Sequence, residues 1–298
     1  MGVSTKLEQA LELIHEDRPE SIDQALALLQ NTVYSFSMKV CGHPEDAEDT
    51  MQEVMVKLLP FLPKFENPQA LSVWLYKVAR TRCQMNRRGA KNARNKHVSL
   101  DELMPNQYEM SELLESGEPS PEDDVLRGES NQRLRDAVLK VPPMYRMVLV
   151  LHDMEGQTTA EVAETTGLKE GTVRVRLHRG RLILRRQLAR MALAKGVVTD
   201  IRAAADEETP KRSRGCRQMF ASLSDYMDGL VKEVRYREME KHLHECKPCV
   251  AFLDSLKSAV EQCRRYEPVC DTQNAETLRQ ELVAKYQAAV AALPKASA

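Results

Sequence analysis

Apolar residues recur every three or four positions through most of the chain, which is the spacing that places side chains on one face of an α-helix. Between residues 22 and 36 the apolar positions are Ile22, Ala25, Leu26, Leu29, Val33 and Phe36. Similar stripes follow Pro44 and run from Leu71 past Ala79, whereas the alternating runs typical of strands are few. The pattern predicts an all-α protein.

Proline and glycine mark the expected helix ends. Two helices are predicted in residues 7–41, with a break at Arg18-Pro19 and an end before Gly42, because glycine accepts the left-handed conformation at a helix exit. The next helix is expected to begin near Pro44, where proline suits the first turn.

Polar segments divide the helical stretches into modules. Residues 98–130 combine Gly117, Pro119 and Pro121 with many acidic side chains, which is typical of a flexible linker. The predicted organisation is an N-terminal helical extension (1–24), a first module (25–97), the acidic linker (98–130), a second module (131–195), a second linker (196–213), a third module (214–268) and a C-terminal tail helix (269–298).

The net charge of −1 is an average over segments of opposite sign. Residues 74–97 hold eight basic and no acidic side chains, and residues 169–190 hold eight basic side chains and one Glu. The linker between them holds ten acidic side chains and one Arg. Two basic blocks on either side of an acidic segment indicate two surfaces for a polyanion.

The N-terminus has no apolar core of a signal peptide, and no 18-residue apolar run occurs, so we expect a cytoplasmic protein with no membrane contact. In that reducing compartment, clustered cysteines bind metal or sense redox state more often than they form disulfides. The seven cysteines therefore point to metal or redox chemistry.

The most specific motif is a helix-turn-helix pattern in residues 158–188. A short helix at residues 160–165 is followed by Thr166-Gly167-Leu168 and then by a second, basic helix. A glycine turn between two short helices is typical of DNA-binding helix-turn-helix proteins. On the second helix the residues expected to face the core are Val173, Leu177, Gly180, Leu184 and Leu188. The residues expected on an outward, largely basic face are Arg174, Val175, His178, Arg179, Arg181, Arg185 and Arg186. The alternative is a solvated Arg-rich surface helix.

This module resembles region 4 of extracytoplasmic-function (ECF) sigma factors, through the string LKVPPMYRMVLVLHDMEGQTTAEVAETTGLKEGTVRVRLHRGRLILRRQL. In that family the second helix reads the duplex −35 promoter element. The resemblance implies DNA contacts by Thr172, Arg174, Val175, Arg176, His178 and Arg179. Val175 stands where the family usually has Ser, and an exposed Val could touch a thymine methyl group.

The first module resembles sigma region 2, through GHPEDAEDTMQEVMVKLLPFLPKF and LSVWLYKVARTRC. The resemblance implies that core RNA polymerase docks on Asp46, Glu48, Asp49, Gln52 and Glu53; without it, a solvated acidic helix would be the preferred interpretation. It also implies that the basic block holds the melted −10 element, with contacts by Arg80, Arg82, Asn86, Arg87 and Arg88. Trp74 is assigned to packing within this module.

The third module contains a candidate zinc site. Cys216, His242, Cys246 and Cys249 form a C-x25-H-x3-C-x2-C pattern, in which His242 lies one helical turn before Cys246. Three thiolates and an imidazole suit tetrahedral Zn²⁺ with no open position, so the site is structural, although oxidation of its thiolates could make it redox-sensitive. His244 is off this spacing and is expected at the surface. The alternative is a group of unconnected cysteines.

The same module resembles zinc-associated anti-sigma domains, through CRQMFASLSDYMDGLVKEVRYREMEKHLHECKPCVAFLDSL. Such domains normally sit on a separate protein and clamp the sigma factor between its two modules, whereas here the domain is part of the same chain. The resemblance implies an intramolecular contact between the zinc domain and the sigma modules, and therefore regulation in cis.

The resemblances together predict a sigma factor that directs core RNA polymerase to promoters, helps to melt the −10 region and performs no catalysis itself. The alternative is a helix-turn-helix transcription regulator that acts without sigma activity. A metalloenzyme is disfavoured, because the four predicted ligands leave no open metal position.

Overall fold

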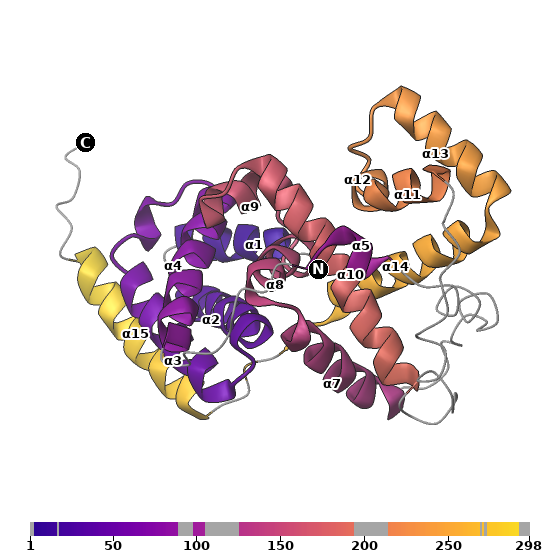
Figure 1. The fold of residues 1–298 in the computed structure, drawn as a ribbon. Coiled ribbons are helices and arrows are strands. Elements are labelled where there is room, and N and C mark those ends of the chain that lie inside the picture. Colours follow the sequence, from indigo (N-terminus) through magenta and orange to yellow (C-terminus); the bar gives the residue numbers. More distant parts are fainter. Residues whose placement is uncertain are drawn as a thin grey trace. The chain divides into compact units, whose positions relative to one another are not determined.

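The computed structural model describes residues 3–16, 18–88, 98–104, 125–193, 214–268, 270 and 273–291. Within these ranges every regular element is a helix, which confirms the predicted all-α fold (Figure 1). The chain forms two compact units. Unit 1 comprises Met1–Ala93, Val150–Leu168 and Glu267–Ala298, and unit 2 comprises Arg94–Leu149 and Lys169–Tyr266.

Unit 1 is built around one long central helix, α2 (Pro19–Cys41), which packs against α1 (Val3–His15), α3 (Pro44–Leu58) and α4 (Pro68–Arg88). The helix begins at Pro19 and ends before Gly42, whose φ is 83°, as the sequence predicts. Its predicted apolar stripe is buried along its whole length. Removing such stripes from water is the main force that holds a helical bundle together, at about 1.5–3 kcal/mol for each large side chain.

Three further segments complete unit 1. They are the 3-10 turn η1 (Leu62–Lys64), the π-helical turn η2 (Val150–Met154) with α9 (Thr159–Thr166), and the C-terminal helix α15 (Gln273–Ala291). The predicted tail helix packs on α2 and α3 through the buried side chains of Leu282 and Tyr286. Arg279 also pairs with Asp23 at 2.8 Å, so this helix is an integral part of unit 1.

Unit 2 is built around α10 (Glu170–Leu193). This helix packs against α5 (Leu100–Leu103), α7 (Val125–Lys140), α8 (Pro143–Leu149), and two helices that follow it in sequence, α12 (Leu223–Met227) and α14 (Lys247–Arg265). The absence of a side chain at Gly180 permits close packing on α8, because a Cβ atom there would lie 3.3 Å from the Tyr145 carbonyl oxygen. Unit 2 also contains α11 (Arg214–Ala221) and α13 (Glu233–Glu245).

The predicted linkers are only partly described. The interval 98–130 contains α5 and the start of α7, and residues 105–124 of it lie outside the described residues. The whole of the second linker, residues 196–213, also lies outside them.

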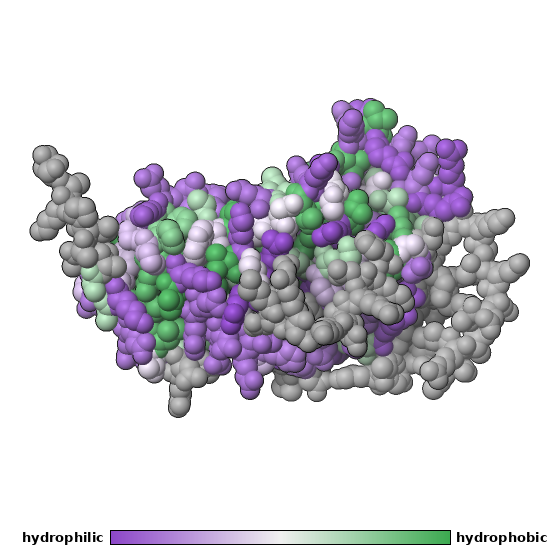
Figure 2. Space-filling model, turned by 60° about the vertical axis from the view of Figure 1, so that its left-hand side comes forward, coloured by the Kyte–Doolittle hydropathy of each residue, from purple (hydrophilic) through white to green (hydrophobic). Residues whose placement is uncertain are grey.

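Figure 2 shows one face on which hydrophilic residues predominate and hydrophobic ones appear in separate patches. A search of the described helices finds none with both the length and the apolar character to cross a membrane.

Candidate functional site

The helix-turn-helix signature has the local geometry that the sequence predicts. Thr158 caps α9 by accepting from the backbone N–H of Glu161, whose carboxylate in turn accepts from the backbone N–H of Thr158. The helix ends before Gly167, which has a φ of 70°, and α10 begins at Glu170. The predicted order of short helix, glycine turn and basic helix is therefore confirmed.

The N-terminal half of α10 presents most of the residues predicted to contact the −35 element. Val175 is 51 % exposed. The predicted residues that are partly exposed are Thr172, Arg174, Arg176 and Arg179. Arg174 forms an ion pair with Glu170 at 3.4 Å on the exposed surface, a contact that water and salt weaken easily. These side chains are accessible to a ligand within unit 2.

The prediction of an outward basic face is wrong for three residues of α10. His178, Arg181 and Arg185 are buried, because α12 and α14 pack on the side of the helix where they lie. The spacing of these residues along the helix is as predicted, but the sequence does not indicate that other helices of the same chain cover that side.

Each of the three buried side chains has specific partners. The Arg181 guanidinium donates to both carboxylate oxygens of Asp228, at 2.8 and 2.9 Å, and its side chain is 0 % exposed. Arg185 donates to the Ser255 hydroxyl at 2.8 Å, and its guanidinium carbon lies 4.2 Å from the centre of the Phe252 ring. Fork-shaped pairing with carboxylates and stacking on aromatic rings are properties of arginine that lysine lacks. Asp228 lies in the Tyr226-Met227-Asp228-Gly229 segment of the third module, and the sequence alone does not predict its pairing with Arg181.

His178 is buried in the same contact. Its Nδ1 atom lies 3.0 Å from the Ser224 hydroxyl in a hydrogen bond, and its ring meets Phe220 edge-on. Burial lowers the pKa of His178 to about 4, and the charges of Arg181 and Arg179 add to the effect. The imidazole is therefore neutral in this packing at neutral pH.

The predicted polymerase-docking residues lie along α3. Asp49 is exposed, and Asp46, Glu48, Gln52 and Glu53 are partly exposed, so the structure leaves all five accessible within unit 1. Glu53 pairs with Lys57 at 2.6 Å and with Arg82 at 2.8 Å, and the hydrogen bond from Lys57 is the main reason that its pKa lies below the usual value.

The predicted −10 residues are only partly described. The side chains of Asn86, Arg87 and Arg88 lie outside the described residues. Arg80 donates to the backbone carbonyl of Thr165 at 3.1 Å, and its burial lowers its pKa. Trp74 packs between Phe61 and Phe65, with ring centres 6.0 and 6.1 Å away, in agreement with its assignment to packing.

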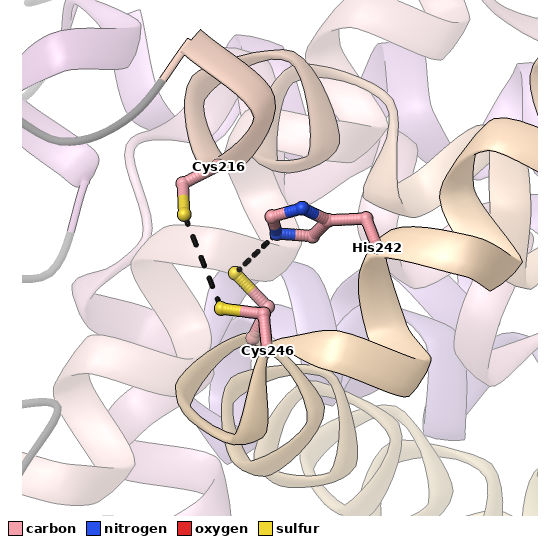
Figure 3. Close-up of side chains that lie close together, drawn as sticks. Cys216, His242 and Cys246 are labelled. Atoms are coloured by element: carbon pink, nitrogen blue, oxygen red, sulfur yellow. Dashed lines mark hydrogen bonds between the residues drawn. The ribbon is translucent and has the colours of Figure 1, made fainter.

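The four predicted metal ligands converge in unit 2. The ligand atoms of Cys216, His242, Cys246 and Cys249 all lie within 4.8 Å of one another. The Sγ atoms of Cys216 and Cys246 are 4.0 Å apart, and His242 Nε2 is 3.3 Å from Cys249 Sγ. Figure 3 shows Cys216, His242 and Cys246 directed toward a common centre. His244 is exposed and lies outside the cluster.

The cluster fits a tetrahedral zinc ion. Zn–S bonds of about 2.3 Å in a tetrahedron place two sulfur atoms about 3.8 Å apart, close to the distance between Cys216 and Cys246. Without a cation, burial raises the pKa of Cys249, and the neighbouring thiols of Cys246 and Cys216 raise it further. A dication would reverse this effect, because it favours thiolates over thiols.

Comparison with known families assigns all three modules. Residues 26–93 match the family described as "Sigma-70 region 2", and residues 131–184 match "Sigma-70, region 4". Residues 216–249, which begin and end at predicted metal ligands, match "Putative zinc-finger".

Individual proteins resemble the chain over slightly more than half of its length. An ECF RNA polymerase sigma factor, SigW of Bacillus subtilis, is 27 % identical over 54 % of this chain and 85 % of its own. The ECF RNA polymerase sigma factor SigE of Mycolicibacterium smegmatis is 29 % identical over 57 % of this chain and 62 % of its own. The RNA polymerase sigma factor YlaC of Bacillus subtilis is 26 % identical over 57 % of this chain and 94 % of its own.

The helix-turn-helix, the two sigma regions and the thiol-imidazole cluster define a DNA-binding transcription protein with a zinc-finger module. More specifically, the chain belongs to the sigma-70 family, and the relatives that it resembles are ECF sigma factors.

Proposed function

We propose that this chain directs core RNA polymerase to specific promoters, helps to melt the −10 region, and is regulated in cis by its zinc-binding domain. The observation that carries the regulatory part is the burial of His178, Arg181 and Arg185 of α10 against α12 and α14. The first two parts rest on the two sigma regions.

Recognition of the −35 element is assigned to the N-terminal half of α10. In helix-turn-helix proteins, the first residues of the second helix reach base edges in the major groove. The accessible residues there are Thr172, Arg174, Val175, Arg176 and Arg179. His178 belongs to the same predicted set and becomes available to DNA only when α12 leaves it.

The −10 element and the polymerase are assigned to unit 1. Arg80, Arg82, Asn86, Arg87 and Arg88 would neutralise the phosphates of the melted strand, since capture of single strands depends on positive charge along the backbone. The acidic side of α3 would dock on core polymerase through Asp46, Glu48, Asp49, Gln52 and Glu53. The accessibility of these α3 residues supports that role.

Cys216, His242, Cys246 and Cys249 would hold one Zn²⁺, with no ligand position left for water. Such a site stabilises a fold and does not activate a substrate. It joins α11 to the junction of α13 and α14, and this geometry would present Asp228 and Phe252 to α10.

Regulation follows from competition for the same arginines. Arg181 and Arg185 could contact phosphates. In this structure, however, Arg181 pairs with the Asp228 carboxylate and Arg185 stacks on the Phe252 ring. The zinc domain would therefore lower DNA affinity, and its departure from α10 would restore the full basic face.

In vitro transcription with core polymerase on a promoter library tests the proposal. The full chain is compared with a truncation that ends near Lys195. We expect both proteins to produce transcripts from the same discrete set of promoters, with the truncation more active at limiting concentration. Absence of transcripts from both, with duplex binding retained, would instead indicate a helix-turn-helix regulator without sigma activity. Equal activity under every zinc and redox condition would contradict regulation in cis.

A further inference from the structure

Unit 1 contains a buried carboxylate that none of the predicted sites uses. Glu155 Oε1 accepts from the Lys39 ammonium at 2.8 Å, and its Oε2 accepts from the Tyr76 hydroxyl at 2.6 Å. The Lys39 and Glu155 side chains are 3 % and 1 % exposed. Burial raises the pKa of Tyr76 well above its usual value, and the charge of Glu155 raises it further, so the phenol remains a donor.

The surrounding contacts are also polar. Arg80 donates to the Thr165 carbonyl at 3.1 Å, and the Gln157 amide donates to the Ser72 hydroxyl at 3.2 Å. Lys39, Ser72, Tyr76 and Arg80 come from α2 and α4, whereas their partners come from the segment that joins η2 to α9 and from α9 itself. The two sides therefore meet in part through donors and acceptors that water could also satisfy.

The two sides belong to different sigma regions. The residues of α2 and α4 lie within the match to region 2, and Glu155, Gln157 and Thr165 lie within the match to region 4. Elements centred at −10 and −35 are separated by about 25 base pairs, or roughly 85 Å along duplex DNA. Side chains 2.8 Å apart cannot remain in contact while the two regions occupy both elements.

A polar contact of this kind is suited to opening. A buried ion pair adds little net stability compared with an apolar pair of the same shape, because both charges lose their hydration. Removal of one partner alone, however, leaves a buried uncompensated charge and strongly disfavours the closed arrangement. The ion pair therefore adds little net stability to the closed arrangement, and that arrangement is sensitive to a change at either charge.

We infer that Lys39, Tyr76 and Glu155 form a latch that holds the first helix of the helix-turn-helix, α9, against region 2 and opens before the chain occupies a promoter. Opening also releases Arg80, a predicted −10 contact, from the Thr165 carbonyl. The requirement for opening rests on the proposed sigma function, whereas the latch itself can be tested without DNA.

Hydroxyl-radical footprinting of the full chain measures the latch through Tyr76, which is 1 % exposed. In Glu155→Gln we expect oxidation of Tyr76 to rise on the order of tenfold, because Lys39 loses its counter-charge. Tyr145 of unit 2, which is 0 % exposed, should stay protected if the chain remains folded. Glu281→Gln removes a carboxylate from an exposed pair with Lys285 and should leave Tyr76 protected.

The double variant Lys39→Met, Glu155→Met tests whether an unpaired charge, and not a change in side-chain volume, opens the contact. Its two apolar side chains no longer bury a lone charge, so Tyr76 should be protected again. Unchanged protection of Tyr76 in Glu155→Gln would overturn the latch. Equal loss of protection at Tyr145 would also overturn it, because Glu155 would then support the whole fold.

Transcription with core polymerase tests the consequence. We expect Glu155→Gln to give several-fold more transcript than wild type at limiting concentration. If Tyr76 opens but transcription equals that of wild type, a role for the latch in promoter binding is overturned. If no protein, wild type included, produces transcripts, the proposed sigma function fails, and the footprint alone decides the latch.

Discussion

At the residue scale, two positions show how local geometry and burial set chemical behaviour. Gly167 ends α9 with a φ of 70°, a conformation that costs other L-residues about 1 kcal/mol or more. His178 carries an imidazole that titrates near neutral pH in water but is neutral when packed against Ser224 and Phe220. Each position gives a measurable prediction.

Gly167→Ala should lower the free energy of unfolding by about 1 kcal/mol, because alanine is strained at positive φ. Gly171→Ala is the matched control. Gly171 lies in the first turn of α10, its φ is ordinary, and an added Cβ would meet nothing within 4 Å, so the change should be neutral or slightly stabilising. Urea unfolding followed by circular dichroism measures both, and equal effects would contradict the role of the turn.

His178 should make the stability of the chain depend on pH between about 6.5 and 4. Above this window the imidazole is neutral in both states and contributes nothing. Within it, the unfolded chain binds a proton that the packed His178, with a pKa of about 4, does not bind, so stability falls as the pH falls. From pH 7.5 to 5.5 the loss should be about 1 kcal/mol larger in wild type than in His178→Gln.

Urea unfolding at both pH values, with zinc in constant excess, makes the measurement. The comparison with His178→Gln cancels the titration of the zinc ligands, which both proteins share. The same pH dependence in the two proteins would show that His178 is not responsible.

At the element scale, α10 has two parts with different surroundings. Near its start Val175 is exposed and Arg174, Arg176 and Arg179 are partly exposed, whereas Arg181 and Arg185 farther along the helix are held by Asp228, Ser255 and Phe252. A basic helix contacts phosphates only through the side chains that it exposes, and each phosphate contact releases counterions. The salt dependence of DNA binding therefore measures how many basic side chains of α10 contact phosphates.

Asp228→Asn should increase the affinity of the full chain for duplex promoter DNA. A buried Arg181 without its counter-charge disfavours the packing of α12 on α10. The slope of log K against log salt should become steeper by about 0.9 for each arginine released to a phosphate. Asp225→Asn, three residues earlier in α12, removes the same charge and leaves the Arg181 pair in place. Identical slopes for both variants and wild type would contradict this account of α10.

At the scale of the whole molecule, the zinc cluster and the C-terminal helix are where distant parts of the chain meet. The cluster joins Cys216 to residues 242–249 inside unit 2, and α15 brings the last described residues onto α2 inside unit 1. Metal binding contributes directly to folding where a small module has little apolar core of its own.

Removal of zinc by a chelator should reduce the helical signal of the residues that form α11–α14 and raise DNA affinity, because Asp228 and Phe252 would no longer be positioned on α10. A chromophoric indicator should detect one zinc per chain. Cys249→Ser should reproduce both effects without chelator, and Cys270→Ala, outside the cluster, should not. Unchanged circular dichroism after complete metal release would show that zinc does not support this fold.

Several features could be predicted from the sequence because they depend on neighbours within a few positions. The stripe on α2, the exit at Gly42, the cap and turn around α9, and the spacing of His242, Cys246 and Cys249 are all local. Cys216 is the exception. It is separated from Cys246 by 30 positions, and what supports its assignment in the sequence is the resemblance to zinc-associated anti-sigma domains.

The sequence by itself determined that the chain is helical, where α2 and α9 end, where α3 begins, and which four residues form the candidate metal cluster. Only the tertiary structure decided which face of α10 is covered, and that Lys39 meets Glu155 across 116 positions. An arginine on a helix has the same periodicity whether water or an Asp carboxylate faces it. Helical periodicity fixes the direction of a side chain, whereas its partner depends on which distant element packs there.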